Sequence, residues 1–428
     1  MAAPKLPLDA AEVGVDFADF ARRIVDLGFI TDPWLDGAPR FSPTPAILSA
    51  TEHRDLLSAG EDLAAVIDEA VQLLMDDDAK RAVYLPLLKT QEAMLKASGG
   101  LWHGIARADV FVTDEGLQVT ELNSDTPTGE PEAIVLGALG ANDHPDLDDA
   151  CATLAARIAG LWETMHRSVV DDDDAQQRRV AAIVYPTEFT EDLSLVRLYR
   201  QLLEESGWRV VLGSPFNLGA SADGGVELFG EQPSLIVRHY KTDWWGERQS
   251  VWTDDVVIDT APLTAPLSVL LAAQARGKAV VVNPFGAVAS QNKRLMAFCW
   301  ERIHRFSTTS QQAIQRLIPY TARLESMHDV QLRADKDRWV IKSDYGAEGD
   351  EVIIGRLTDE DTWHKTIDKA RRGCFIAQRY FQARTDPRGI VQNHGVFIVG
   401  GEACGVYTRR DAGHTDPSAL SVPTLVRR

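Results

Sequence analysis

The alternation of apolar and polar positions divides the chain into a helical first part, a parallel α/β middle and a mixed last third. Alternating runs at 104–112 and 117–123 predict two strands, and the pattern at 148–170 predicts a helix after them. An earlier stretch repeats apolar side chains at spacings of three and four, which predicts an amphipathic helix. Those side chains are Leu63, Val66, Ile67, Ala70, Val71 and Leu74.

The middle of the chain follows the order strand, helix, strand. An apolar run at 179–186 is followed by a helical stretch at 190–207 and a second apolar run at 208–215. Runs at 234–240 and 266–284 continue this order. The order predicts βαβ units and a parallel sheet covered by helices. No G-x-G-x-x-G follows the first strand, so the unit lacks the dinucleotide-binding fingerprint.

The last third has an α+β pattern. A helix is predicted over 292–306, and strands at 338–346 and 350–355 flank a small glycine loop. Runs at 374–381 and 395–410 predict antiparallel strands. The expected fold class is therefore a multidomain combination of α/β and α+β.

Changes of pattern set the expected domain boundaries, and the clearest linker is the charged run 171–179. The expected units are 1–100, a helical segment; 101–174, a hairpin with the helices after it; 175–285, the βαβ unit; and 286–428, the remaining helices and strands.

Composition is that of a globular protein. A chain of 428 residues needs two or three packed cores. The formal net charge of -19 argues against a nucleic-acid or anionic-membrane partner, because both require basic patches. No apolar run approaches the roughly 18 residues of a membrane span, and the first residues carry no secretion signal, so we expect a cytoplasmic protein. The oligomeric state is not indicated.

The four cysteines, Cys151, Cys299, Cys374 and Cys404, are scattered without C-x-x-C spacing and lie among apolar or small residues. We expect buried, reduced thiols rather than disulfides or a zinc site.

The first two strands form an expected hairpin with polar residues on one face. If 114–116 is a three-residue loop with glycine in the left-handed position, Thr113 pairs with Leu117. The same register, continued along the ladder, places Asp109 opposite Glu121. It also places Arg107 opposite Asn123, whereas a four-residue loop would break this register.

Two carboxylates directly across a ladder repel each other unless something neutralises them. Mg²⁺ prefers carboxylate and amide oxygens and also binds phosphates, which makes Asp109, Glu121 and Asn123 candidate ligands. Arg107 suits an anion at the same place. The alternative is a solvated polar face on which these carboxylates simply meet water.

Two lysines could complete a nucleotide site. Lys293 precedes a predicted helix, and Lys342 ends a strand just before the glycine loop that holds Gly346 and Gly349. Backbone N–H groups and an ammonium both favour phosphate. The alternative is a pair of surface lysines beside an ordinary turn.

The stretch RHYKTDWWGERQSVW is dense in aromatic residues. Such density is typical of a core or of a wedge between domains. The functional alternative is the wall of a substrate cleft, with Lys241 and Thr242 contacting a carboxylate.

With these pieces together, the chain resembles the synthetase part of the glutathionylspermidine synthase family, which has a permuted ATP-grasp fold with a preATP-grasp domain. The main carrier is RADVFVTDEGLQVTELNSDTPT, which is similar to the family's R-x-D followed by E-x-N-x-D-x-P-T. Further segments are similar to the family and follow in its order: YKTDWW, the NK pair before RLM, VIKSDYGAEG, IAQRYF and GVYTRRD. The matches span roughly residues 100 to 415. Ala347 stands where the family's glycine loop commonly has arginine, and the amidase domain that some members carry before the synthetase is not in this sequence.

The resemblance implies a role for each matched residue. Asp109, Glu121 and Asn123 would hold Mg²⁺, and Arg107 would steady the transferred phosphoryl group. The ATP phosphates would be bound by Lys293, Lys342 and the loop of Gly346 and Gly349, and the adenine by Gln378 and Tyr380. Expected substrate contacts are Asp125, Thr126, Thr128, Lys241, Thr242 and Arg409.

The implied activity is an ATP-dependent carboxylate–amine ligase that forms an amide through an acyl phosphate. Its cofactors would be ATP and Mg²⁺, and its partners a small-molecule carboxylate and an amine, neither of which the sequence identifies. Two alternatives remain: a non-catalytic nucleotide-binding or regulatory protein on an ATP-grasp scaffold, and a phosphotransferase.

Overall fold

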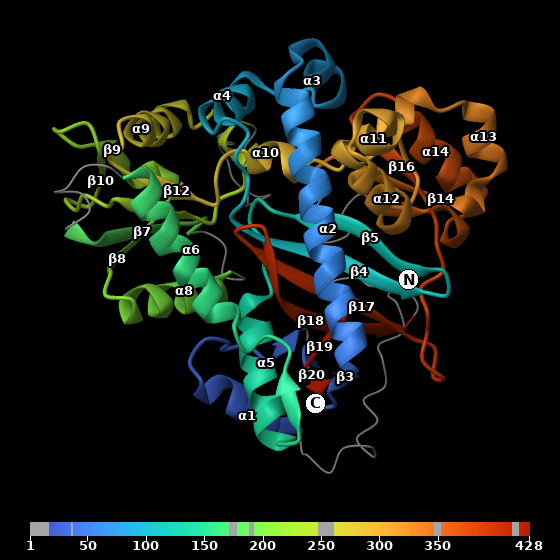
Figure 1. Ribbon diagram of the computed structural model, residues 1–428, viewed down its shortest axis with the longest axis horizontal. Helices are drawn as coiled ribbons and strands as arrows, with labels where there is room; N and C mark the ends of the chain where they lie inside the picture. Colours follow the sequence, from blue (N-terminus) through green and yellow to red (C-terminus); the bar gives the residue numbers. More distant parts are fainter. Residues whose placement is uncertain are drawn as a thin grey trace.

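A computed structural model describes residues 17–35, 37–170, 178–187, 192–246, 261–345, 352–412 and 419–428 (Figure 1). Its centre is a five-stranded antiparallel sheet of order β19-β18-β17-β4-β5. The strands are β4 (Ile105–Thr113), β5 (Gly116–Asn123), β17 (Ile390–Val399), β18 (Glu402–Ala412) and β19 (Leu420–Val422).

The predicted amphipathic helix is α2 (Ala50–Met75), which crosses the central sheet in Figure 1. A capping box between Ser49 and Glu52 sets its start, because each group satisfies the other's backbone N–H. The apolar stripe of α2 packs into one core with side chains of β4, β5, β17 and β18. The first hundred residues therefore supply part of the packing under the hairpin.

The predicted βαβ order is confirmed by a parallel sheet of order β12-β11-β7-β8. Apolar cores cover both of its faces, as the continuous apolar runs require. Its strands and helices are β7 (Val180–Val184), α8 (Leu193–Glu205), β8 (Arg209–Gly213), β11 (Leu235–Arg238), α9 (Thr264–Ala275) and β12 (Val280–Val282). The small hairpin of β9 (Leu218–Ala220) and β10 (Val226–Leu228) lies beside α9.

A third sheet, of order β13-β16-β14-β15, lies on the other side of the central sheet from the parallel sheet in Figure 1. One face packs on α14 through a core that includes Trp339, Ile341 and Trp363. The elements of this unit are β13 (Thr321–Arg323), α13 (Asp329–Ala334), β14 (Trp339–Ser343), β15 (Val352–Ile354), α14 (Glu360–Ala370) and β16 (Phe375–Arg379).

Shorter elements join these sheets. A small sheet of order β3-β20-β6 lies near the C-terminus, next to α5. The remaining bounds are α1 (Phe17–Asp26), β1 (Trp34–Leu35), β2 (Ala38–Pro39), β3 (Ala46–Leu48), α3 (Asp78–Tyr84), α4 (Lys89–Ala97), α5 (Glu130–Asp143), β6 (Leu147–Asp149), α6 (Leu154–Val169), α10 (Ala287–Ser290), α11 (Arg294–Glu301), α12 (Thr308–Leu317) and β20 (Thr424–Arg427).

The aromatic segment divides into two parts. Trp245 is fully buried and contacts the rings of Tyr240 and Phe285, as the core alternative predicts. Lys241 is half-buried, and its Nζ lies 5.0 Å from the centre of the Trp244 ring. Trp252 lies outside the described residues, as does most of the charged run 171–179.

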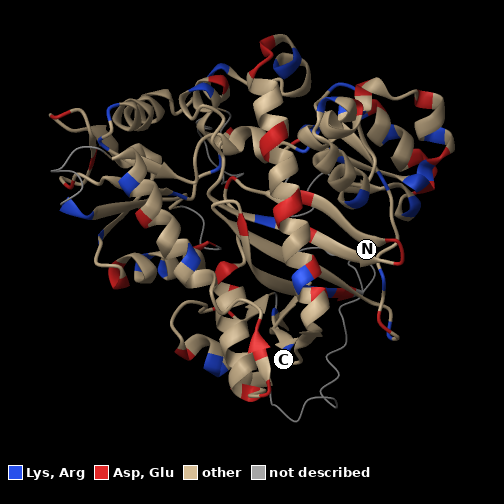
Figure 2. Cartoon of the chain, in the orientation of Figure 1, with Lys and Arg blue, Asp and Glu red and all other residues tan. Residues whose placement is uncertain are grey.

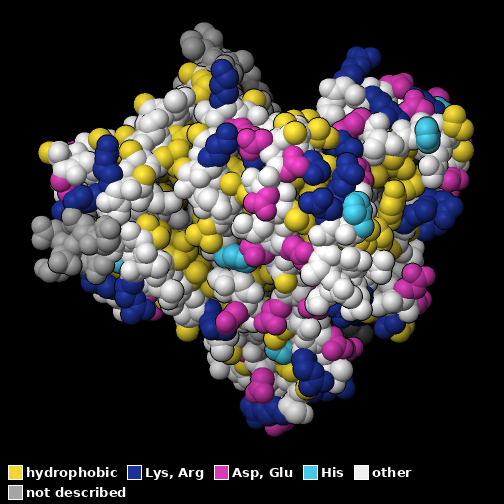
Figure 3. Space-filling view, turned by 45° about the horizontal axis from the view of Figure 1, so that its top comes forward, with side chains coloured by type: hydrophobic (Ala, Val, Ile, Leu, Met, Phe, Trp, Pro, Cys, Tyr) yellow, Lys and Arg dark blue, Asp and Glu magenta, His cyan; other side chains and the backbone are white. Residues whose placement is uncertain are grey.

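The prediction of buried cysteines is confirmed at three positions and wrong at the fourth. Cys151, Cys299 and Cys404 are buried, Cys374 is partly exposed, and none of the four forms a disulfide. Figure 2 shows acidic and basic positions on the outer helices and on the central strands, and the face in Figure 3 mixes both signs. In the described part of the chain, no helix has both the length and the apolarity to cross a bilayer.

Candidate active site

The hairpin of β4 and β5 pairs Asp109 with Glu121 and Arg107 with Asn123, as the sequence predicted. The predicted three-residue loop, from which this register was derived, is wrong. Thr113 pairs with Gly116, so the loop has two residues, and a β-bulge at Thr120 shifts the register by one. A bulge places two residues opposite one, so it compensates for the shorter loop.

Arg107 and Asp109 form a buried ion pair on β4. Arg107 Nε lies 2.8 Å from Asp109 Oδ1, and Arg409 on β18 donates to Asp109 Oδ2 at 3.0 Å. Gly395 makes room for this group, because a Cβ there would lie 2.7 Å from the Arg107 side chain. Burial alone would lower the pKa of Arg107, but the charge of Asp109 raises it above its ordinary value. Arg409, expected at the substrate, therefore contacts Asp109.

Glu121 lies between a lysine and an amide. Its Oε2 is 3.2 Å from Lys293 Nζ, and its Oε1 accepts from Asn123 Nδ2 at 3.4 Å. Burial would raise the pKa of Glu121, but the charges of Lys293 and Lys342 outweigh burial and lower it to about 2. The carboxylate is therefore ionised and suited to a hard cation.

Lys342 reaches the hairpin from β14 of the third sheet. Its Nζ donates to the Thr120 carbonyl at the bulge, over 3.2 Å. Burial lowers the pKa of Lys342 to about 8, although Glu121 opposes this shift. The end of β14 is also bonded to the segment before α11, because Lys293 N donates to the Asp344 carbonyl, 2.9 Å away.

Positive side chains gather around the hairpin. Of the residues that the structure describes, Arg107, Lys293 and Lys342 are buried beside the carboxylates of Asp109 and Glu121, and the partly exposed Arg409 joins them. Cations gathered in this way favour a polyanion, and phosphates bring Mg²⁺ with them. Among the described residues no three Asp, Glu, His or Cys groups converge on one metal position. The hairpin carries the oxygens of Asp109, Glu121 and Asn123, which were predicted as Mg²⁺ ligands, at neighbouring positions of the ladder.

The loop after β5 is fixed to the parallel sheet. Asp125 Oδ2 accepts from the backbone N and the hydroxyl of Thr242 at 2.7 and 3.0 Å. Asp125 Oδ1 lies 2.7 Å from Arg238 Nη2 in a fully buried pair. Asp125 and Thr242, two of the expected substrate contacts, thus contact each other. Thr126 is half-buried, whereas Thr128 is exposed and its carbonyl accepts from Arg107.

The expected adenine contacts lie on and beside β16. Gln378 is buried and donates to the Thr321 hydroxyl at 3.1 Å. The ring of Tyr380 is covered by the Arg356 guanidinium at 4.8 Å. Gly346 and Gly349, with Ala347 between them, lie outside the described residues.

Three polar residues at the site were missed by the sequence-based reasoning. Asn283 bonds both backbone groups of Ile105 and the carbonyls of Ser124 and Asp125. Arg238 and Gln291 bond the same loop. Their contacts join segments more than 100 residues apart, and only the short spacing of Gln291 from Lys293 could have drawn attention to one of them.

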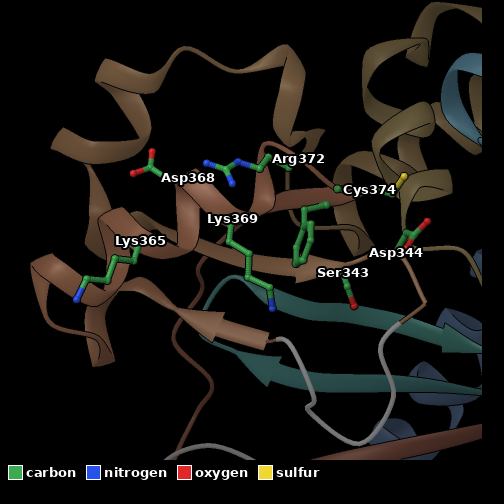
Figure 4. A pocket seen from close by; sticks show the side chains of 9 residues that line it. Ser343, Asp344, Lys365, Asp368, Lys369, Arg372 and Cys374 are labelled. Atoms are coloured by element: carbon green, nitrogen blue, oxygen red, sulfur yellow. The ribbon is translucent and has the colours of Figure 1, made fainter. Parts of the chain in front are cut away.

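A separate cavity of about 550 Å³ lies next to the end of α14 (Figure 4). Lys365, Lys369 and Arg372 line it, together with Asp344 and Asp368. None of the residues expected at the active site lines it, although Asp344, which does, accepts from Lys293 N.

Comparison with a solved structure of low sequence identity shows a shared fold, and two further structures are less similar. A glutathione synthetase-like effector from Globodera pallida, in its apo form, is 11% identical over 99% of each chain, with a TM-score of 0.56. A putative gamma-glutamylcysteine synthetase from Methylobacillus flagellatus is 13% identical over 89% of this chain and 88% of that one, with a TM-score of 0.42. A RimK-domain ATP-grasp protein from Sphaerobacter thermophilus is 15% identical and covers 57% of this chain and 89% of its own, with a TM-score of 0.31.

A comparison with proteins of curated function finds no match. The family comparison, by contrast, covers nearly the whole sequence. The family described as glutathionylspermidine synthase preATP-grasp matches residues 19–427, which include the hairpin, the parallel sheet and the third sheet. The chain therefore belongs to the glutathionylspermidine synthase preATP-grasp family.

Proposed function

We propose that this protein is an ATP-dependent ligase that joins a small-molecule carboxylate to an amine through an acyl phosphate. The observation that carries the proposal is the convergence of Lys293, Lys342 and Arg107 on the ionised Glu121 carboxylate. Family membership supports an ATP-dependent ligase, and the acid, the amine and the acyl phosphate are the finer parts of the proposal.

In the proposed reaction, a substrate carboxylate oxygen attacks the γ-phosphorus of ATP and the bond to the β,γ-bridging oxygen breaks, which releases ADP. A neutral amine then attacks the acyl carbon, phosphate leaves, and the amine loses a proton. Mg²⁺, when bound with ATP, would neutralise charge on the phosphate oxygens.

The residues of the hairpin would act by position and charge. Asp109, Glu121 and Asn123 would present oxygens to the cation. Lys293 and Lys342 would bind the phosphates, since they already converge on Glu121 and on the bulge. Arg107, fixed by Asp109 and by the Thr128 carbonyl, would hold negative charge on the transferring group. No covalent nucleophile is needed in phosphoryl transfer of this kind.

The test is an ADP-release screen over amino acids, short peptides including glutathione, and polyamines, with ATP and Mg²⁺. A ligase releases ADP and phosphate only when acid and amine are both present. A phosphotransferase would instead give a stable phosphorylated product with one substrate. A non-catalytic nucleotide-binding protein would bind ATP and release no ADP with any pair.

Glu121→Gln provides the matching variant. Removal of the charge while the side-chain shape is kept should lower ADP release at least about a hundredfold, because cation binding and phosphate positioning both depend on that carboxylate. Thermal unfolding should show that the variant is folded. Near-normal turnover by a folded Glu121→Gln protein would contradict the placement of the site.

A further inference from the structure

Gln291 links the segment before Lys293 to the end of β5. Its Oε1 accepts from the backbone N of Ser124 at 2.8 Å and of Asp125 at 3.1 Å. Its Nε2 donates to Asn123 Oδ1 at 3.5 Å. The amide of Gln291 is therefore held at its oxygen by two backbone donors, and its nitrogen is left to face Asn123.

The orientation of Gln291 determines the orientation of Asn123. A flip of the Asn123 amide would turn its NH₂ group towards the NH₂ group of Gln291, and two donors cannot bond each other. In the observed orientation Asn123 Nδ2 donates to Glu121 Oε1 at 3.4 Å. The oxygen of Asn123 has two lone pairs, so it can accept from Gln291 and still bind a cation, whereas the amide nitrogen offers no lone pair to a metal.

We propose that Gln291 is a positioning residue that keeps the Asn123 amide oxygen, rather than its nitrogen, available to the divalent cation. This inference rests on the metal placement in the proposed function. When a residue that hydrogen-bonds a metal ligand without contacting the metal is removed, the metal affinity commonly falls by about 10- to 100-fold. The sequence gives no sign of this role, because a glutamine beside a lysine is unremarkable until the fold brings it to β5.

The test measures Mn²⁺ affinity in the presence of ADP by calorimetry, which does not require the substrates or turnover. Gln291→Met should weaken Mn²⁺ binding about tenfold. Gln274→Met is the matched control, since Gln274 Oε1 also accepts from a backbone N–H, that of Val281 at 3.1 Å, but away from the site. The control should keep the wild-type Mn²⁺ affinity.

A second background separates orientation from general damage. A carboxylate presents an oxygen in either orientation, so Asn123→Asp should remove the need for Gln291. We therefore expect Gln291→Met to change Mn²⁺ affinity less than about twofold in the Asn123→Asp background. A loss of equal size in both backgrounds would overturn the proposal, and so would an unchanged affinity in the Gln291→Met single variant.

Two further measurements keep the result decisive. Gln291→Ala is tested beside Gln291→Met, and whichever variant unfolds thermally like the Gln274→Met control is used. Glu121→Gln distinguishes a failure of the positioning role of Gln291 from a failure of the metal placement. If it weakens Mn²⁺ binding and Gln291→Met does not, only the positioning role fails; if neither weakens it, the metal placement of the proposed function fails as well.

Discussion

The hairpin gathers cations in a chain that is acidic as a whole. The sequence carries a net charge of -19, yet among the described residues Arg107, Lys293 and Lys342 are buried beside Asp109 and Glu121, and the partly exposed Arg409 joins them. Burying several like charges close together has a cost in the free protein that a bound polyanion would offset. The pKa of Lys342, lowered to about 8 by burial, is the sign of that cost.

The lowered pKa of Lys342 makes ATP binding sensitive to alkaline pH. The ammonium is present below pH 8 and is lost as the pH rises through that value, so the KM for ATP should rise up to about tenfold from pH 7 to pH 9. Lys342→Arg should remove this rise, because a guanidinium stays charged. Lys96→Arg, at an exposed lysine, should keep it. Steady-state kinetics across this range checks the prediction, and a Lys342→Arg profile as steep as the wild-type one would refute it.

At the scale of elements, the hairpin shows what the sequence could and could not predict. The alternation of side chains correctly predicted that Asp109 faces Glu121. The loop length and the bulge at Thr120 were missed, because alternation alone reveals neither of them. The loop is one residue shorter than predicted and the bulge adds one residue, so the two errors cancel in the pairing of Asp109 with Glu121. The bulge also has a consequence, since the Thr120 carbonyl accepts from Lys342.

The joint between sheets could not be predicted in the same way. The βαβ order follows from local patterns, but the bonds of Asn283 and Arg238 to the loop after β5 join distant segments. The spacing of apolar residues along the sequence does not encode such a contact. Asp125 and Thr242, both expected at the substrate, come from two separate matched segments, and their side chains bond each other and hold the loop after β5.

Asn283 should be a principal determinant of the stability of this joint. Asn283→Ala would leave both backbone groups of Ile105 and the carbonyls of Ser124 and Asp125 without their partner. A buried unpaired polar group costs about 1–3 kcal/mol, so the free energy of unfolding should fall by at least about 3 kcal/mol. Denaturant unfolding measures this value.

The control for that variant is Asn217→Ala. Asn217 Oδ1 also accepts from a backbone N–H, that of Ser214 at 2.9 Å, but its bond lies within a single local turn. Its loss should cost about 1 kcal/mol. Equal losses in the two variants would mean that Asn283 acts as a local turn residue and not as the link between sheets.

At the scale of the molecule, the central sheet contributes to two cores, while the third sheet has a core of its own. Side chains of α2 and of the central strands share one core, while strands of the parallel sheet share another with β17 and β18. The sequence predicted the sheets and their classes but not this sharing, because core assignment depends on which apolar faces meet. One consequence is a buried carboxyl, Glu130, at the start of α5 beneath the loop.

Glu130 should make the stability of the whole molecule depend on pH. Burial raises its pKa to about 8, although the Tyr199 hydroxyl bonds it at 3.2 Å. In the folded protein the carboxyl stays protonated up to about pH 8, whereas in the unfolded chain it ionises above about pH 4. Its contribution is therefore complete below that lower value and is lost as the pH rises towards 8, at about 1.4 kcal/mol per pH unit.

Glu130→Gln should remove this slope. Between pH 6.5 and 8 the free energy of unfolding of the wild type should fall by about 2 kcal/mol from this group, and that of the variant should not. The window excludes Asp149, Asp243 and Asp344, because burial raises their pKa values only to about 6. Glu204→Gln, at an exposed pair with Arg200, is the control and should keep the wild-type slope. Denaturant unfolding at four pH values decides the matter: parallel curves for Glu130→Gln and wild type would show that this carboxyl is already ionised at pH 6.5, because the cations around Arg107 then hold it charged despite its burial.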